Sequence, residues 1–549
     1  MPKIKLLFHT LRNLKPVQIY GRLWFRLYKP RPDLSLRPEI RLITGKWCDT
    51  ATREPSLIGP SLFCFLNKEF EITKPVDWNE VGLAKLWLYN LHYFDDLNAK
   101  GAEGRKNWHA DLIEKWLSEN PPGQGNGWEP YPISLRAVNW IKWALTGNEL
   151  PENAVKSLAV QVRYLSIRLE RHLLGNHLLA NAKALLFAGY YFKGSEADVW
   201  KATGEKILFE QLPEQILPDG GHFERSPMYH SIVLEDLLDC LNLLNTFGEG
   251  GSNLHGLLTS KAISMLAFLR DILHPDGEIP FFNDSAFGLV PTPNEIFSYA
   301  RRLGIITEDG KGTSSDEIIG KSEFGLWVLK KGEAHIIVDA GPIGPDYLPG
   351  HAHCDTLSYE MSVAGKRFIV NSGTYAYEGP ERHWFRSTAA HNTVRIDSEE
   401  QHEIWANFRV ARRGYPFGVN IEENERECRF EAAHDGYSRL KGSPIHRRKI
   451  RLGEGQMSVE DTIEGNRIHM VESYIHLHPD VKIIEKNENE VLCDLDGKRI
   501  MIRCANDERL QVENSFFSPE FGKKLENTVL VLEKKDSTPI IMSYEILIH

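Results

Sequence analysis

The chain has 549 residues, of which 42% are hydrophobic and 26% charged, and its formal net charge is −10. That length argues for several domains, each with enough apolar residues for a core of its own. The acidic balance excludes a generally basic nucleic-acid binder, and no uninterrupted apolar stretch approaches the ~20 residues that a membrane-spanning helix needs.

The N-terminal segment, residues 1–78, begins with the basic and amphipathic stretch MPKIKLLFHTLRNLKPVQIYGRLWFRLYKPRP. It has neither a long apolar region nor a small-residue cleavage site, so we expect no secretory signal and a cytoplasmic location. We expect the segment to pack on the helical domain that follows; docking to a membrane surface or to a partner is the alternative. The seven cysteines are scattered without a CxxC pair, which predicts reduced thiols rather than disulfides or a cysteine zinc site.

Residues 79–307 are predicted to form a helical domain. Apolar residues recur at three- and four-residue spacing in six segments, at 81–97, 133–147, 152–173, 176–192, 231–247 and 260–273. Breaks rich in Gly and Pro separate these segments, as is typical of helical hairpins wrapped into a bundle or ring. The absence of a strict sequence repeat disfavours a regular solenoid.

The period changes after a small, polar stretch, which predicts a linker at 308–322 and an all-β domain at 323–549. GLWVLKKGEAHIIVDAG is typical of two strands joined by a tight turn, and later stretches such as RKIRLG and NTVLVLEKK alternate or are rich in β-branched residues. Many short strands at this spacing predict an antiparallel sandwich. Active sites often lie at the interface of two such domains.

Histidines and tyrosines concentrate beside predicted turns in both halves. Asn176 and His177 open one predicted helix, and Tyr229 and His230 open another, at helix N-termini where the dipole favours anions. A helix cap for Asn176 and simple packing for the Tyr-His pair are the alternatives. The β half contributes a second group, His351, His353, Asp355 and His391.

Six motifs in order resemble the heparinase II/III family of polysaccharide lyases. They are GWEPYPISLRAVNWI (127–141), GNHLLANAKAL (175–185), DGGHFERSPMYHSIVLEDL (219–237), GHAHCDTLSYEM, VNSGTYAY and AAHNTV. The resemblance covers most of the chain and implies an incomplete α/α toroid followed by an antiparallel β-sandwich. It also implies β-elimination, in which a proton leaves C5 of a uronic acid and the 4-linked oxygen departs.

The resemblance implies a role for each site residue. Asn176, supported by His177, would neutralise the uronate carboxylate, because the C5 proton is a poor acid while that group is ionised. Tyr229 would act as general base, general acid or both, and His351 as the second proton-transfer or charge-stabilising group. Nearby cations are expected to lower the pKa of Tyr229 from ~10. Further substrate contacts are expected from Arg136, Arg225, His230, Tyr375, Tyr377 and Arg386.

A structural metal is the open question of the β-sandwich. Some relatives bind one through two histidines and an aspartate, and His353 and His391 match the two histidines. The aspartate position is occupied by Asn371 in VNSG, and a neutral amide is a weaker zinc ligand. We expect no cofactor to be required, with a structural zinc or calcium ion as the alternative.

The predicted function is therefore a lyase whose partner is an acidic polysaccharide, with no nucleic acid and no integral membrane segment. The net negative charge requires local cations, for which RHWFR (382–386) and RVARR (409–413) are candidates. A glycoside hydrolase would need two carboxylates, for which Asp219, Glu224 and Asp284 are candidates. A glycan-binding or assembly factor for capsule or exopolysaccharide is the third hypothesis. The polymer, endo or exo action and the oligomeric state stay open.

Overall fold

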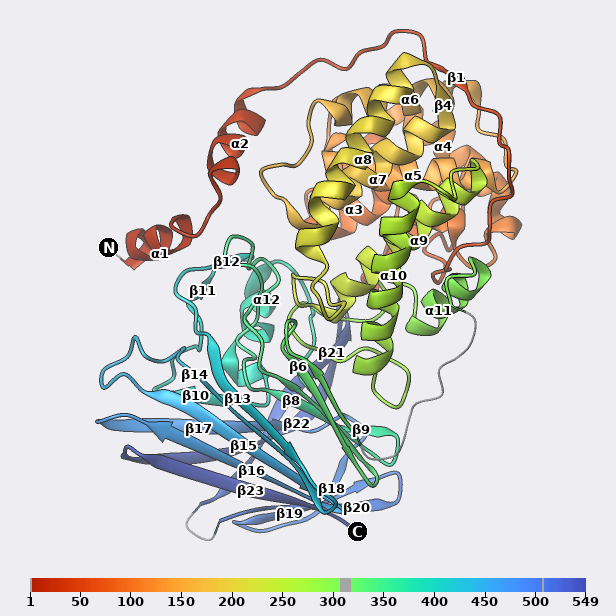
Figure 1. Ribbon diagram of the computed structural model, residues 1–549. Helices are drawn as coiled ribbons and strands as arrows, with labels where there is room; N and C mark the ends of the chain where they lie inside the picture. Colours follow the sequence, from red (N-terminus) through yellow and green to blue (C-terminus); the bar gives the residue numbers. More distant parts are fainter. Residues whose placement is uncertain (1, 307–316, 506–507) are drawn as a thin grey trace.

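The computed structural model describes residues 2–306, 317–505 and 508–549, and helices fill its first half while antiparallel sheets fill its second (Figure 1). This agrees with the predicted change of period and with a toroid followed by a sandwich. The helical domain consists mainly of α3 (Lys85–Tyr93), α4 (Lys106–Glu119), α5 (Pro130–Leu145), α6 (Glu152–Ser166), α7 (Gly175–Tyr191), α8 (Ser195–Gln215), α9 (Pro227–Thr246), α10 (Asn253–Ile272) and α11 (Pro293–Arg302).

Small residues and helix caps determine how the central helices sit. Gly189 of α7 and Gly204 of α8 allow the two helices to approach closely, since a Cβ at Gly189 would lie 2.6 Å from the backbone nitrogen of Lys201. Helix α9 begins after Ser226, whose hydroxyl accepts a hydrogen bond from the Tyr229 backbone N–H, and Pro227 occupies its first turn. The cap therefore places Tyr229 in the first turn of α9.

Three large antiparallel sheets, besides the two-stranded pair of β11 (Ile404–Trp405) and β12 (Arg409–Val410), build the described part of the second half. The five-stranded sheet has the order β5 (Glu317–Lys321), β6 (Leu326–Lys331), β7 (Ala334–Asp339), β8 (Tyr359–Val363) and β9 (Lys366–Ile369). The four-stranded sheet has the order β10 (Val394–Ile396), β17 (Ile468–His476), β22 (Lys523–Ser537) and β21 (Leu510–Glu520). The eight-stranded sheet has the order β13 (Pro416–Glu423), β14 (Glu427–His434), β15 (Ile445–Gly453), β16 (Gln456–Glu464), β23 (Ile540–Ile548), β20 (Lys498–Cys504), β19 (Glu490–Leu495) and β18 (Lys482–Lys486).

Burial along the strands follows the sequence alternation. In β15 and β16 every second side chain is buried and the others reach solvent or the partly covered face, as expected of a sheet with one packed face. All five residues of β8 are buried, because this strand lies inside the domain. The predicted linker at 308–322 falls mostly outside the described residues, and its last part is strand, since β5 begins at Glu317.

An apolar contact joins the helical domain to the sheets. Phe268 and Ile272 of α10 pack with Phe324 and with Leu326 and Val328 of β6, and all five side chains are buried. The two halves are therefore held in a fixed relation, and side chains contributed by both can form one site.

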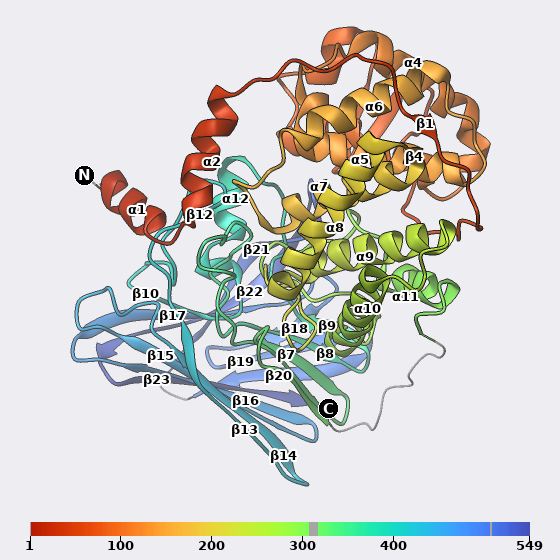
Figure 2. The same cartoon turned by 45° about the horizontal axis from the view of Figure 1, so that its top comes forward.

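The N-terminal helices α1 (Pro2–Leu11) and α2 (Pro16–Leu27) lie to the side of both domains (Figure 2). Helix α2 contacts both halves, with Phe25 packed on His172 and Gln18 donating to the Tyr347 carbonyl. Helix α1 lies beside β12 (Arg409–Val410) of the β half, with the Trp405 indole N–H donating to the Thr10 hydroxyl (3.0 Å). No helix within the described residues is both long and apolar enough to cross a membrane.

Candidate active site

Five side chains from the two halves meet where α7 and α9 face the β domain. We call Asn176, Glu224, Tyr229, His351 and Tyr377 the junction cluster. Tyr229 lies against His351, with ring centroids 3.8 Å apart, and its hydroxyl is 2.9 Å from that of Tyr377. His351 Nε2 lies 3.4 Å from Glu224, whose carboxylate in turn accepts from Asn176. The structure thus brings together Asn176, Tyr229 and His351, as predicted, and adds Glu224.

Glu224 positions the start of α7. Its two carboxylate oxygens accept the backbone N–H of Asn176 (2.9 Å) and the Asn176 side-chain amide (2.8 Å). Gly175 makes room for this contact, because a Cβ there would lie 2.1 Å from Glu224 Oε1, and its φ of +55° is also one that glycine tolerates best. Burial would raise the pKa of Glu224, but His222, His351 and Asn176 outweigh it and the pKa is lowered.

Asp284 orients His351 from the opposite side. It accepts from His351 Nδ1 and from His353 Nε2, each at 2.9 Å, and pairs with both terminal nitrogens of Arg382. Burial would raise the pKa of Asp284, but Arg382 and the two histidines hold it well below its usual range. A carboxylate bonded to Nδ1 fixes the orientation and tautomer of the imidazole, so Nε2 is the His351 nitrogen that faces the cluster.

The pKa of Tyr229 is raised, not lowered as the sequence had led us to expect. Burial is the main cause, and the carboxylates of Asp284 and Glu224 add to it; the hydrogen bond from Tyr377 and the charge of Arg382 oppose it only in part. The phenol is therefore neutral in the unliganded protein. In this state Tyr229 is equipped to donate a proton.

His177 lies beside the cluster. Its Nδ1 is 3.2 Å from Glu170, and its ring packs against Tyr131 with centroids 4.4 Å apart. Burial lowers the pKa of His177, but Glu170 outweighs burial and the net shift is upward. The upward shift favours the charged form of His177, which next to Asn176 suits an anionic substrate group.

Several residues that the sequence predicts to contact substrate are buried away from the junction cluster. Arg136 is fully buried, bonded to Gln161 and to the carbonyls of His92 and Gly127, and stacked on Trp116. His230 is fully buried against the Met265 carbonyl. These two predictions are corrected, because both side chains are part of the helical core.

The side chains of Arg225 and Arg386 donate hydrogen bonds to backbone carbonyls rather than facing the junction cluster. Arg225 donates to the carbonyls of Glu323 and Phe324. The fully buried Arg386 donates to the carbonyls of Ala352, Ala406 and Asn407. Since Ala352 lies between His351 and His353, Arg386 positions the segment that carries both histidines, and its predicted contact with substrate is corrected.

The two tyrosines expected to contact substrate differ. Tyr377 belongs to the junction cluster, whereas Tyr375 stacks on Phe385 and lies near Lys524.

The basic runs provide fewer cations for an anionic substrate than expected, because Arg412 forms an ion pair with Glu403 and Arg413 forms one with Asp346.

The residues at the expected metal position do not fit a three-ligand site. His353 Nδ1 and His391 Nε2 lie 3.2 Å apart as a hydrogen-bonded pair, and Asn371 Oδ1 accepts the backbone N–H of Asn392. Burial lowers the pKa of both histidines, so both rings are neutral. No cluster of three His, Cys, Asp or Glu side chains suited to a metal occurs in the described parts of the chain.

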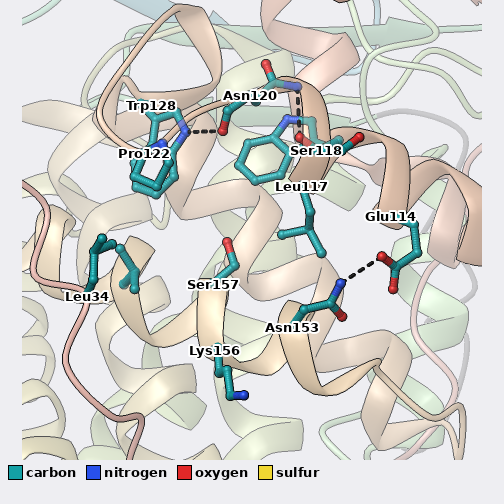
Figure 3. A pocket seen from close by; sticks show the side chains of 12 residues that line it. Leu34, Glu114, Leu117, Ser118, Asn120, Pro122, Trp128, Asn153, Lys156 and Ser157 are labelled. Atoms are coloured by element: carbon teal, nitrogen blue, oxygen red, sulfur yellow. Dashed lines mark hydrogen bonds between the residues drawn. The ribbon is translucent and has the colours of Figure 1, made fainter.

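A separate pocket of about 420 Å³ opens between α4 and α6, and Figure 3 shows its lining. Asn153 donates to Glu114 (2.7 Å) on one wall, and the Trp128 indole donates to the Asn120 carbonyl (3.2 Å) on another. No residue predicted for the active site lines it. The pocket is therefore distinct from the junction cluster.

Sequence reasoning had noted Glu224 and Asp284 only as possible hydrolase carboxylates. Both lie in turn-rich stretches, DGGHFERSP and FFNDSAFG, with the buried Phe223 next to Glu224 and the buried Phe282 two residues before Asp284. An acidic residue in such an apolar context is the signal that each has a buried cationic or amide partner.

Two family models match consecutive parts of the chain. The model described as "Heparinase II/III N-terminus" matches residues 104–294, and "Heparinase II/III-like, C-terminal" matches residues 321–544. Together they cover most of the chain and both halves of the junction cluster.

Among the curated relatives are heparin-sulfate lyases and a protein named for its localisation with FtsZ. A heparin-sulfate lyase of Pedobacter heparinus is 24% identical over 462 residues, covering 76% of this chain and 66% of the relative. A heparin-sulfate lyase of Bacteroides stercoris is 26% identical over 246 residues, covering 41% of this chain and 36% of the relative. The "FtsZ-localized protein C" of Caulobacter vibrioides is 24% identical over 443 residues, covering 75% of this chain and 72% of the relative. The chain thus spans two thirds or less of the two lyases.

Solved structures agree on the fold. A crystal structure of heparinase III has a TM-score of 0.71 at 17% identity and covers 97% of this chain and 89% of its own. The heparan sulfate lyase of Pedobacter heparinus has a TM-score of 0.59 at 20% identity and covers 97% of this chain and 88% of its own. The predicted toroid-plus-sandwich fold is confirmed.

Proposed function

Because this chain belongs to the heparinase II/III-like family, we propose that it is a polysaccharide lyase that cleaves a uronate-containing acidic polysaccharide by β-elimination. The observation that carries the proposal is the junction cluster, in which Asn176, Tyr229 and His351 come from separate elements and lie in one connected group. The names of the heparin-sulfate lyases support the substrate class.

The reaction has four requirements, and each can be met by a different side chain of this group. The substrate carboxylate must be neutralised so that the C5 proton becomes more acidic, which suits the Asn176 amide and the His177 imidazole beside it. A base takes the C5 proton, the C5 electron pair forms the C4–C5 double bond, and the C4–O bond breaks. The leaving oxygen then takes a proton from an acid.

We assign the base to His351 and the acid to Tyr229. Asp284 holds His351 through Nδ1, so Nε2 can accept the C5 proton and the carboxylate stabilises the imidazolium that forms. The raised pKa of Tyr229 keeps its proton available for the leaving oxygen. Tyr377, 2.9 Å away, orients the phenol.

Two alternatives are less well supported. A glycoside hydrolase needs a carboxylic acid of raised pKa as proton donor, yet the pKa values of Glu224 and Asp284 are both lowered by their partners. The name of one relative, "FtsZ-localized protein C", suggests a binding or assembly role as the second alternative. That role would not require the proton-transfer pair Tyr229 and His351.

The test is ultraviolet absorbance of unsaturated uronate products on a panel of uronate-containing polysaccharides. We expect turnover with the unaltered chain, loss of turnover in Tyr229→Phe with glycan binding retained, and full turnover in Tyr190→Phe at the far end of α7. New reducing ends without ultraviolet absorbance would indicate hydrolysis. Binding without either signal in the unaltered chain would favour the assembly role.

The acid–base assignment has its own test. A uronide with fluoride at C4 needs no proton on its leaving group, because fluoride departs as an anion. We expect Tyr229→Phe to retain most of its activity on that substrate, while His351→Ala is inactive on both substrates. The reverse pattern would assign Tyr229 as the base.

A further inference from the structure

The two N-terminal helices present their apolar sides to solvent. On α1 the exposed apolar residues follow helical spacing, and on α2 they form two adjacent rows. We call this set the outer face: Ile4, Leu7, Phe8 and Leu11 of α1, with Ile19, Tyr20, Leu23, Trp24 and Leu27 of α2. Leu27 is 80% exposed and Trp24 is 62% exposed. Soluble protein surfaces rarely leave this many large apolar side chains of two consecutive helices uncovered.

The opposite sides of the helices hold them on the body. Gln18 is fully buried and donates to the Tyr347 carbonyl (3.0 Å), and Phe25 packs on His172 with ring centroids 4.3 Å apart. Gly21 lies between them along α2, where a Cβ would be 2.9 Å from that of His172. On α1, the Thr10 hydroxyl is the contact with Trp405. Polar groups and a glycine thus face the protein while most of the large apolar side chains face away, the reverse of a helix packed on a core.

Charge distinguishes this segment from the rest of the chain. Residues 1–32 contain eight Lys and Arg and no Asp or Glu, in a protein of net charge −10. Lys5, Arg12 and Arg26 are exposed beside the outer face, and Lys29 follows α2. Cations flanking an apolar helical face that contains Trp, Tyr, Phe and Leu are typical of helices that lie in the interface of an anionic membrane.

We propose that α1 and α2 dock the protein on an anionic lipid surface, with the outer face among the acyl chains at the headgroup boundary and the flanking Lys and Arg on the lipid phosphates. Charge complementarity favours lipid over a protein partner, because the segment offers cations around an apolar face without a single acidic group to specify a partner. The helices have 10 and 12 residues, too few to span a bilayer, so the chain rests on the membrane and both domains stay in water. A lyase held in this way would act on polymer close to the membrane.

The experiment is flotation of the full chain with vesicles of phosphatidylcholine, with and without phosphatidylglycerol. We expect binding only when phosphatidylglycerol is present, and weaker binding at high salt because the charges are then screened. The double variant Leu23→Glu with Trp24→Glu should lower the bound fraction about tenfold or more, because it places carboxylates at the lipid boundary. Lys5→Glu with Arg26→Glu should lower it as well.

The matched controls are Val81→Glu, at a fully exposed apolar residue of the body, and Lys46→Glu, at an exposed cation outside the segment. Both should float like the unaltered chain, and turnover of soluble substrate should be the same in all variants. Absence of flotation with anionic vesicles, or equal flotation of the outer-face variant, would overturn the proposal. A dimer that Leu23→Glu dissociates, without vesicle binding, would also overturn it and make the outer face a contact between copies.

Discussion

Glu224 holds Asn176 by two hydrogen bonds, one to its backbone N–H and one to its side-chain amide. Both donors reach one buried carboxylate, at 2.9 Å and 2.8 Å, and this contact ties the loop before α9 to the first turn of α7. The amide that we assign to the substrate carboxylate is therefore oriented before substrate arrives, and Glu224 acts as a positioning residue.

Glu224→Gln should reduce kcat more than it changes KM. Glutamine has one acceptor oxygen, so one of the two bonds to Asn176 is lost, and the loss of a buried hydrogen bond costs about 1–3 kcal/mol, or roughly ten- to hundredfold in rate. Steady-state kinetics on the substrate found in the panel measures the effect. Gly175→Ala, which would push against Glu224 Oε1, should reproduce it. A variant with unchanged kcat would show that Glu224 serves stability alone.

Tyr377→Phe separates the two possible roles of Tyr229. The hydrogen bond from Tyr377 lowers the pKa of Tyr229, so its removal should raise that pKa further. If the neutral phenol is the acid, the acidic side of the pH profile of kcat/KM should stay where it is, because the phenol is protonated there in both proteins, apart from a uniform loss of rate. A displacement of the acidic side to higher pH would show that activity depends on the phenolate and that Tyr229 is the base.

The sequence predicted the architecture because the two hydrophobic periods are local properties. Apolar spacing of three and four gave the helices, and alternation gave the strands, without knowledge of the contacts between them. Asn176, Tyr229 and His351 could be identified together because each belongs to a recognisable motif. Arg136 and His230 belong to the same motifs, yet they are buried, because residue type alone does not reveal whether a cation meets carbonyl groups or solvent. For α1 and α2 the sequence left packing on the body and docking to a membrane surface both open, since amphipathicity does not tell which side faces the protein.

A chelator should leave the protein folded and active. His353 and His391 are hydrogen-bonded to each other, and Asn371 accepts from Asn392, so these side chains have partners within the protein and we expect folding not to require a metal. The thermal midpoint and turnover before and after EDTA, together with elemental analysis of the purified protein, measure this. Stoichiometric zinc or calcium, with a fall in midpoint on its removal, would contradict the prediction.

Asp284→Asn should destabilise the protein strongly at neutral pH. Arg382 and Asp284 are both buried, and removal of one partner of a buried pair leaves an uncompensated charge at a cost of about 3–5 kcal/mol. The folded-state pKa of Asp284 is lowered, so its contribution is present above the unfolded pKa of ~4 and is lost only as the pH falls toward the folded value. Urea unfolding should show the full difference from the unaltered chain at pH 7, nearly all of it at pH 4, and a smaller difference only as the pH falls further below 4. The matched control is Asp496→Asn at the exposed pair with Lys366, which should change little.

Asp355→Asn should stabilise the protein at neutral pH, which is the opposite of the effect expected for Asp284→Asn. Burial raises the pKa of Asp355 to about 6, and Asp284 adds to the shift, while the backbone N–H of Asn283 opposes it. A carboxyl group with a raised folded-state pKa contributes stability that is fully present below its unfolded pKa of ~4 and is lost as the pH rises through about 6. Asparagine keeps an oxygen for the Asn283 N–H but does not ionise. Between pH 4 and pH 7 the free energy of unfolding of the variant should therefore rise relative to that of the unaltered chain, by up to about 3 kcal/mol. Urea unfolding of both proteins across this range measures the gain. A difference that stays constant with pH would show that Asp355 is already ionised in the folded protein throughout, and that its charge is stabilised by groups other than Asn283.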